Sequence, residues 1–297
     1  MFNKIIMYLE GGAMSGVFGA GVLAKLLEND FYPHIEAIYA ASSGAINGAY
    51  FLARQQFSSF YYNELTHDFI LPHRIIPGIG QLLWNRFISP LPREKAKNVI
   101  DVDYVFSTLK EKKPLDVEKL KEQDIPLYAK LLSVSTGDIF YKEVTKSDDP
   151  FIILKAAVCI KPYYFSTQTI DGKEYIDGAI KESLGLGYLL AKHPHSKIAV
   201  ILNEPVARQA GHTVKNFIEG LCASLYPYPI PLFSYFMARE RLVREDIAIA
   251  HNNPRVLLVS PPPDNLTVPQ TTNPSNLKDT YEKGREEAEK IVNFVKT

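Results

Sequence analysis

Short apolar runs alternate with amphipathic segments over the first part of this chain. Ile5–Leu9 and Ile35–Ala40 are mostly apolar and have a length typical of buried strands. The segments that follow them, 17–27 and 44–53, have the apolar spacing of helices. Strands that alternate with helices indicate an α/β fold, with a parallel or mixed sheet between helical layers.

Two stretches of turn-forming residues predict hairpins farther along the chain. Ser135–Asp138 separates apolar runs at 127–134 and 139–144. Asp171-Gly172 precedes a second short arm at 174–176. The other expected elements are strands at 198–203 and 255–259 and helices at 149–159, 213–224, 234–250 and 276–296.

The organisation of the chain favours one domain. Residues 57–116 have no sharp period and predict short helices and loops. There is no internal repeat or convincing linker, and 297 residues are within the range of a single α/β domain. We expect one domain over 1–297, with a motif-bearing core at 1–205 and a helical extension at 206–297 packed on it.

Hydropathy predicts no membrane-spanning segment. A span needs roughly 18 apolar residues, and the closest candidate, 217–237, contains Glu219 and three prolines. The apolar run at the N-terminus is too short for a signal peptide and has no small-residue cleavage site behind it. We expect a cytoplasmic protein and leave peripheral contact with a membrane open.

Charge and cysteine content weaken other classes of function. The 33 basic and 33 acidic residues cancel, which argues against a general nucleic-acid partner. Cys159 and Cys222 cannot build a disulfide framework and lack the spacing of metal ligands. These features favour a reducing compartment and no metal site, and they leave the oligomeric state open.

The first candidate for chemistry is Ser42, between the second strand and its helix. A nucleophile elbow needs small neighbours because the serine sits in a strained turn, and Ala40 and Gly44 supply them. A helix that starts at Gly44 would also direct N–H groups and its positive dipole end at a developing oxyanion. A serine that only caps the helix is the alternative.

A second candidate is the small-residue turn from Gly11 to Gly16. Such a turn exposes backbone N–H groups that can stabilise an oxyanion or bind a phosphate. A dinucleotide-binding turn needs a different glycine spacing and an acidic residue at the end of the second strand. The second strand here ends at serines, which disfavours that reading.

The third candidate is Asp177, in a turn at the end of a short strand. An Asp-Gly pair is usually only a turn, but a serine hydroxyl needs a base to become nucleophilic. Histidines at 193, 195, 212 and 251 follow Asp177 in the order of an α/β-hydrolase triad. Only one strand precedes the elbow, however, and we expect His193 and His195 to be solvent-exposed. We therefore expect no catalytic histidine.

The order of these motifs resembles the patatin-like phospholipases, especially a bacterial branch that begins Glu-Gly-Gly-Gly-Met-Arg-Gly. The resembling stretches are Leu9–Phe18, Gly21–Leu23, Ser42–Asn47, Asp101–Phe106 and Ile170–Gly178. Together these motifs extend over about residues 9 to 205. The resemblance implies a three-layer α/β/α sandwich with a mixed, mostly parallel sheet.

The resemblance also implies a catalytic Ser42–Asp177 dyad without histidine, metal or cofactor. Asp177 would accept the proton of Ser42 and later activate water on the acyl-enzyme. The backbone N–H groups of Gly11, Gly12 and Ala13 would form the oxyanion hole. The implied substrates are lipid esters such as phospholipids and lysophospholipids.

Three positions depart from the family pattern. Ala13 replaces the third glycine, Ser15 stands where the family has Arg or Lys, and Ala40 replaces the first glycine of the elbow. Ala40 is a mild change, whereas Ser15 removes a cation from behind the turn. A catalytically degenerate protein that binds lipid or a partner therefore remains the alternative.

An aromatic, proline-rich stretch at 225–236 has two interpretations. It suits a lid or a membrane-interface surface near a lipid site, and it suits core packing for the C-terminal helices, which we favour. Trp84 could line an acyl pocket, although anchoring a helix is its default role.

Overall fold

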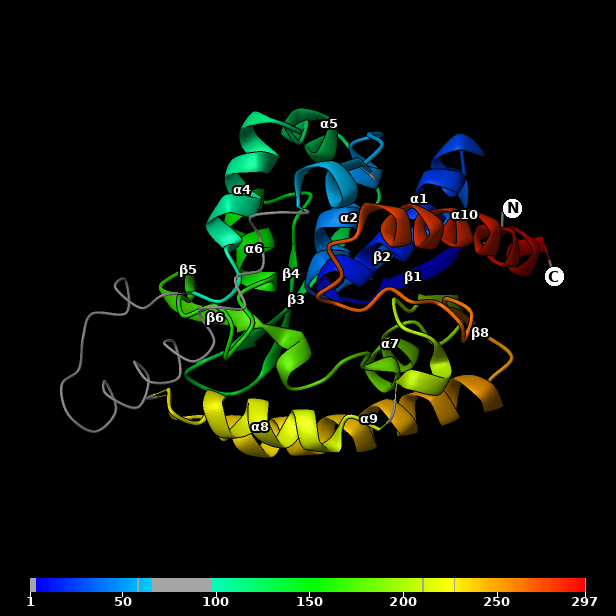
Figure 1. Ribbon diagram of the computed structural model, residues 1–297. Coiled ribbons are helices and arrows are strands. Elements are labelled where there is room, and N and C mark those ends of the chain that lie inside the picture. Colours follow the sequence, from blue (N-terminus) through cyan, green and yellow to red (C-terminus); the bar gives the residue numbers. More distant parts are fainter. Residues whose placement is uncertain (1–3, 58, 66–97, 210, 227, 297) are drawn as a thin grey trace.

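A mixed sheet forms the centre of the molecule (Figure 1). The structure is a computed structural model that describes residues 4–57, 59–65, 98–209, 211–226 and 228–296; Trp84 lies outside these residues. The strands are ordered β5-β6-β3-β2-β1-β7-β8, and β4 pairs with β3. Their bounds are β1 Ile5–Leu9, β2 Ile35–Ala40, β3 Leu127–Ser133, β4 Ile139–Glu143, β5 Gln168–Ile170, β6 Lys173–Asp177, β7 Lys197–Ile201 and β8 Val256–Val259.

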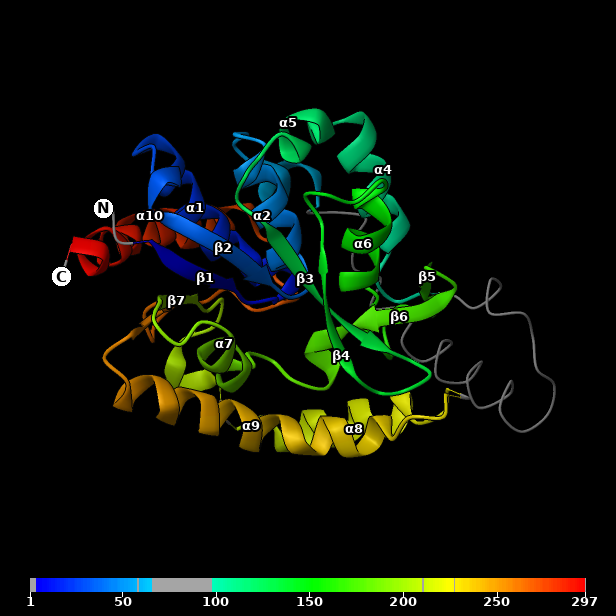
Figure 2. The ribbon, with the colours of Figure 1, turned by 180° about the vertical axis from the view of Figure 1, so that it is seen from behind.

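Helices cover both faces of the sheet (Figures 1 and 2). The longer helices of the upper layer in Figure 1 are α1 Val17–Glu28, α2 Ser43–Leu52, α4 Val102–Glu111, α6 Pro150–Ala157 and α10 Pro274–Lys296. The lower layer holds α7 Leu186–Lys192, α8 Thr213–Ala223 and α9 Leu232–Asn252. This arrangement confirms the predicted fold class.

The alternation of side chains along β1 builds a core on each side of the sheet. Ile5, Met7 and Leu9 join the core that includes α1, α2 and α10. Ile6 and Tyr8 join the core on the other face, which includes residues of α7. All five are buried, which explains why this strand reads as one continuous apolar run rather than an alternating one.

Most predicted elements are present, with ends shifted by a few residues. Both hairpins are antiparallel pairs, β3 with β4 and β5 with β6. The short helix α7 was not predicted, because its seven residues, which follow Gly185 and include Gly187, are too few to show a period. The division into a core at 1–205 and an extension at 206–297 stays a prediction.

The strand register brings the end of β6 next to the end of β2. Ala40 pairs with Ala129 of β3, and two residues farther along β3, Leu131 pairs with Asp177. Because β4 occupies the other side of β3 over these residues, β6 must lie on the β2 side, directly beyond the end of β2. The residue that follows β2 by two positions is Ser42, so the register sets Ser42 and Asp177 at the same level.

The C-terminal helix and the aromatic stretch complete the packing. The buried residues of this stretch are Tyr226, Ile230, Leu232 and Phe236. Their burial confirms the core-packing interpretation for these residues within 225–236.

No helix in the described residues is long and apolar enough to cross a membrane.

Candidate active site

The backbone of Ser42 lies in a strained turn between β2 and α2. Its φ of 51° and ψ of −131° fall outside the regions that most L-residues occupy. A nucleophile elbow is a strained strand-to-helix turn of this kind. The Ser42 side chain makes no capping hydrogen bond to α2, so a simple capping role does not account for its position.

Ala40 and Gly44 are the small neighbours of the elbow. Ala40 is fully buried at the end of β2. A Cβ on Gly44 would lie only 2.5 Å from the carbonyl oxygen of Leu9 and 2.6 Å from that of Glu10. Gly44 therefore lets α2 begin directly against the end of β1, as a tight elbow requires.

The glycine turn after β1 contacts Ser42. A Cβ on Gly11 would lie 2.6 Å from the Ser42 Cβ. Gly12 has a φ of 143°, which favours glycine, and Ala13 has a φ of 48° despite its Cβ. Among the described residues, the N–H groups of Gly11, Gly12 and Ala13 donate no hydrogen bond within the protein. Three free donors thus lie in the turn that touches the serine.

Ser15 is fully buried in this turn. Its Oγ donates a hydrogen bond of 2.7 Å to the carbonyl oxygen of Gly12, and its N–H donates to the same oxygen at 3.0 Å. The position where the family has a cation therefore holds a hydroxyl that hydrogen-bonds within the turn.

Asp177 is fully buried at the end of β6. Its Oδ1 accepts a hydrogen bond of 2.9 Å from the Ala179 N–H. Burial raises the pKa of the Asp177 carboxyl to about 6, against the opposing effects of hydrogen bonds from Ala179 and from the Ser42 hydroxyl.

The contact between Ser42 and Asp177 is loose. The Ser42 hydroxyl is close enough to lower the pKa of Asp177, yet Oδ2 has no well-aligned hydrogen-bond partner among the described residues. A long contact of this kind is common between catalytic groups in the absence of substrate. The structure therefore brings the predicted pair close together, with the Asp177 carboxyl buried.

Sequence reasoning missed a buried polar network behind the glycine turn. Asn203 Nδ2 donates to the carbonyl oxygens of Glu10 at 2.7 Å and Gly11 at 3.0 Å. The Glu10 carboxyl accepts from the Asn203 N–H at 2.7 Å and from Gln209 Nε2 at 3.1 Å. Burial raises the pKa of Glu10 to about 7. The signal that could have revealed Asn203 is a polar residue at the end of a buried strand.

Ser42 is one of the residues that line an apolar pocket of about 60 Å³. Its walls come from the glycine turn, α2, the segment around Phe60, the start of α4 and the residues after α6. The lining residues are Ala13, Ser42, Ser43, Ile46, Phe57, Phe60, Tyr61, Leu65, Ile100, Val102, Val105, Val158 and Ile160.

The expectation that His193 is solvent-exposed is wrong, whereas His195 is exposed. The His193 side chain is only 13% exposed, and its ring nitrogens contact the Tyr39 hydroxyl at 3.0 Å and Glu36 at 3.2 Å. The reason is the unpredicted helix α7, which ends at Lys192, directly before His193, and packs against the sheet. In the described part of the chain, no histidine hydrogen-bonds to Ser42 or Asp177, and no cluster of side chains suits a metal.

Several known proteins are similar to this chain. A family described as Patatin-like phospholipase matches residues 7–190. The uncharacterized protein YjjU of Escherichia coli (strain K12) is 24% identical over 200 residues, which cover 61% of this chain and 47% of YjjU. The chain thus matches about half of the length of that relative.

Two solved structures are similar at low identity. VipD from Legionella pneumophila has a TM-score of 0.47 and 12% identity, over 99% of this chain and 67% of VipD. The type III effector protein ExoU has a TM-score of 0.41 and 12% identity, over 98% of this chain and 53% of ExoU. The family match covers more than half of this chain and includes the glycine turn, the elbow and Asp177. The chain therefore belongs to the patatin-like phospholipase family.

Proposed function

We propose that this protein is a serine acyl hydrolase that cleaves lipid esters through a Ser42–Asp177 dyad. The observation that carries the proposal is the convergence at Ser42. A strained serine turn, a buried carboxyl and three free backbone donors come together there from β2, β6 and the turn after β1. These are the nucleophile, base and oxyanion donors that acyl transfer needs.

In the proposed reaction, Ser42 Oγ attacks the ester carbonyl carbon while its proton passes to Asp177. The carbonyl oxygen becomes an oxyanion that accepts hydrogen bonds from Gly11, Gly12 and Ala13. Each such donor is typically worth about 3 kcal/mol in the barrier. The tetrahedral intermediate then expels the alcohol, which takes the proton from Asp177 and leaves an acyl-serine.

Hydrolysis of the acyl-serine repeats the same steps with water. Asp177 accepts a proton as water attacks, the second intermediate expels Ser42 Oγ, and the proton returns to the serine. A carboxyl with a pKa of about 6 is ionised at neutral pH and is more basic than an ordinary aspartate, which suits a general base. The chemistry requires no metal or cofactor.

The apolar pocket supports an acyl chain as the group that is transferred. Its walls carry aliphatic and aromatic side chains, among them Ile46, Phe60 and Val105, and the proposed nucleophile is one of its lining residues. An apolar pocket with a few convergent polar groups is the usual form of such a site.

Hydrolysis of the soluble ester p-nitrophenyl butyrate tests the proposal. Ser42→Ala should lower kcat by at least about 10⁴-fold, and Asp177→Asn by about 10²- to 10⁴-fold because the base is lost. Asp171→Asn is the control. It makes the same substitution in another Asp-Gly pair, Asp171-Gly172, in the exposed turn between β5 and β6, and it should retain full activity. Wild-type turnover that survives in Ser42→Ala or Asp177→Asn would contradict the dyad.

The alternative is a protein that binds lipid without turnover. Ala13, with its positive φ, and Ser15, in place of a cation, are the observations that favour it. It predicts no ester hydrolysis by the wild-type protein.

A further inference from the structure

Helix α8 carries its apolar residues on the side that faces solvent. Val214, Phe217, Ile218 and Leu221 are 75%, 48%, 54% and 53% exposed. Their spacing of i, i+3, i+4 and i+7 aligns them in one row along the helix, which we call the α8 stripe.

The inner side of α8 is polar and small by contrast. Asn216, Glu219 and Gly220 are buried, and Gly220 lies close enough to α9 that a Cβ would be 3.0 Å from the Phe236 Cβ. A surface helix normally buries its apolar row and exposes its polar one. The reversed pattern of α8 indicates that the α8 stripe contacts something other than water.

We propose that the α8 stripe is a docking surface for a lipid bilayer that contains anionic lipids. The choice of a bilayer over a protein partner rests in part on the proposed function, since a lipid hydrolase must reach a substrate held in a membrane. The remaining support comes from the charge around the stripe, its size and its distance from the acyl pocket.

Cations flank the stripe, while neighbouring carboxylates are largely covered. The side chains of Lys215, Arg241 and Arg244 are 45%, 66% and 64% exposed. Glu219 and Glu240, the partners of Lys215 and Arg244, are only 7% and 17% exposed. Glu245, the partner of Arg241, is 52% exposed. An apolar row with basic residues beside it is the pattern of helices that lie in the interface of an anionic membrane.

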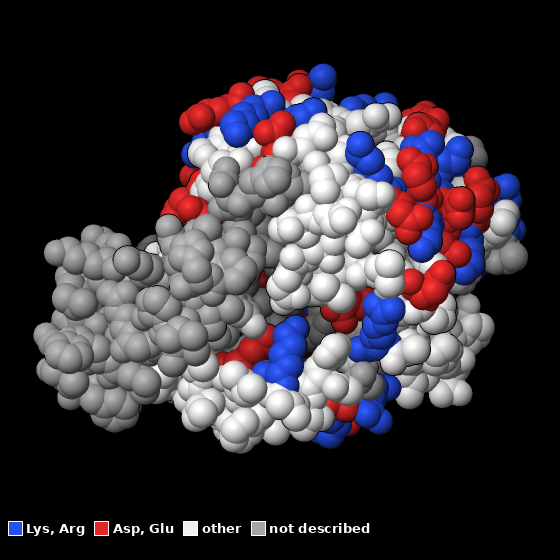
Figure 3. All heavy atoms as spheres, viewed as in Figure 1, with Lys and Arg blue, Asp and Glu red and all other residues white. Residues whose placement is uncertain are grey.

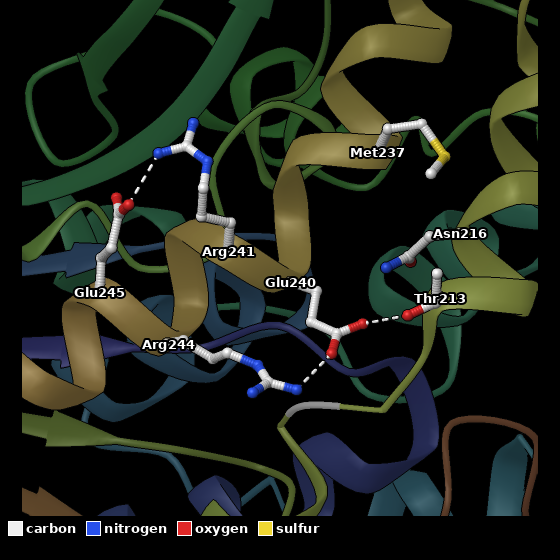
Figure 4. Close-up of a pocket in the computed structure, with 7 residues that line it drawn as sticks. All are labelled: Thr213, Asn216, Met237, Glu240, Arg241, Arg244 and Glu245. Carbon is white, nitrogen blue, oxygen red and sulfur yellow. Dashed lines mark hydrogen bonds and ion pairs between the residues drawn. The ribbon is translucent and has the colours of Figure 1, made fainter.

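A groove of about 380 Å³ separates the start of α8 from α9 beside the stripe (Figure 4). Met237 extends its apolar side chain into the groove. Arg241 Nη1 holds Glu245 at 2.7 Å, and Arg244 Nη2 holds Glu240 at 2.6 Å. Each pair uses one guanidinium nitrogen, and a guanidinium has five N–H donors, so both arginines retain donors for a lipid phosphate.

The size of the stripe disfavours a second copy of this chain. Four partly exposed side chains present on the order of a few hundred Å², whereas a stable protein interface buries ~800 Å² on each partner. In Figure 3 the lower-left area of the surface beside the grey atoms is mostly white, with Lys, Arg, Asp and Glu atoms next to it. A one-helix apolar row of this size suits insertion among lipid headgroups.

Tyr163 connects α8 with the acyl pocket. Glu219 on the inner side of α8 accepts a hydrogen bond of 2.5 Å from the Tyr163 hydroxyl. The Tyr163 carbonyl oxygen accepts from the Ile100 N–H at 3.2 Å, and its N–H donates to the Ile160 carbonyl at 3.1 Å. Ile100 and Ile160 both line the pocket, so a membrane at α8 would lie close to the site.

Sedimentation with sucrose-loaded vesicles tests the docking surface. All proteins carry Ser42→Ala, so that no lipid is cleaved during the measurement. The parent should bind vesicles of phosphatidylcholine with 30% phosphatidylglycerol, and bind pure phosphatidylcholine more weakly. Ile218→Ser with Leu221→Ser should lower the partition coefficient for the anionic vesicles by about tenfold.

Leu266→Ser is the matched control, because Leu266 is 71% exposed outside the α8–α9 layer; it should leave binding unchanged. Three results would overturn the proposal. The parent does not bind the anionic vesicles, the α8 variant binds them as well as the parent does, or the parent is a dimer and the α8 variant is a monomer. The same substitutions are also made in the protein that retains Ser42. These variants should hydrolyse p-nitrophenyl butyrate at the wild-type rate, which excludes misfolding. If the wild-type protein does not cleave this soluble ester, the proposed function fails while the vesicle result still stands.

Discussion

Ser15 stands where the family has a cation, and it makes a hydrogen bond within the glycine turn. Its buried hydroxyl donates a hydrogen bond of 2.7 Å to the Gly12 carbonyl oxygen, within the turn that contains the three free donors. This hydrogen bond is made by a neutral hydroxyl and needs no charge. The departure at Ser15 is therefore compatible with an ordered oxyanion turn.

Ser15→Ala should leave this turn less ordered. Loss of one hydrogen bond of this kind costs about 1 kcal/mol, so we expect kcat for p-nitrophenyl butyrate to fall about fivefold with little change in KM. The control is Ser107→Ala, which removes the same type of bond, from Oγ to the carbonyl three residues earlier, on the exposed face of α4. Unchanged kcat in Ser15→Ala would show that the hydroxyl does not support the turn.

Local patterns in the sequence point to the proposed catalytic residues but not to the residues that support them. Ser42, Asp177 and Gly11 stand in recognisable local motifs with small neighbours. Asn203 and Gln209 reach Glu10 from nearly 200 positions away in the chain, and no local pattern encodes such a contact. Supporting hydrogen bonds depend on the tertiary fold, so they appear only in the structure.

At the scale of elements, the contact between α1 and α10 depends on two glycines. A Cβ on Gly284 of α10 would clash with the carbonyl oxygen of Phe18 and lie 3.2 Å from the Val22 N–H nitrogen. A Cβ on Gly21 of α1 would clash with the carbonyl oxygen of Tyr281. The two helix backbones can approach this closely only because neither position has a side chain.

Gly284→Ala should therefore destabilise the protein by about 1–3 kcal/mol, as overpacking of a tight contact does. Gly187→Ala is the matched control, since a Cβ at this helical position in α7 would meet nothing within 4 Å. It should be neutral or stabilise the protein by up to about 1 kcal/mol, because alanine favours helices. Urea unfolding measures both, and equal effects of the two substitutions would contradict the close approach of α1 and α10.

Elements with a continuous apolar run or a clear period were predicted best, since burial decides their sequence. β2 begins and ends where its apolar run does, whereas α7 has too few residues to show a period. The position of β6 beyond the end of β2 was not predictable. It depends on which side of β3 is left free by β4, and that is a property of the sheet register.

At the scale of the whole molecule, the buried carboxyl of Asp177 links function to stability. The pKa of Asp177 is raised from 3.8 to about 6 by burial, so the folded protein binds this proton more tightly than the unfolded chain does. The associated stability is fully present below pH 3.8 and is lost as the pH rises through about 6. At neutral pH the ionised carboxylate therefore costs about 3 kcal/mol of folding free energy.

Asp177→Asn should remove this cost while it removes activity. We expect the variant to be more stable than the wild type at pH 8, by up to about 3 kcal/mol, and the gain to shrink as the pH is lowered towards 5. Urea unfolding across this range checks the sign, with exposed Asp171→Asn as the control. A variant that is less stable than the wild type at pH 8 would contradict a desolvated carboxylate at this site.

The site of covalent modification is the most direct measurement of whether Ser42 is the nucleophile. The wild-type protein should react with a fluorophosphonate at neutral pH, and peptide mass spectrometry should locate one adduct on Ser42 rather than on the adjacent Ser43. Ser42→Ala should not be labelled, and Asp177→Asn should be labelled at least about 10²-fold more slowly. An adduct at another residue, or labelling that persists in Ser42→Ala, would contradict the account.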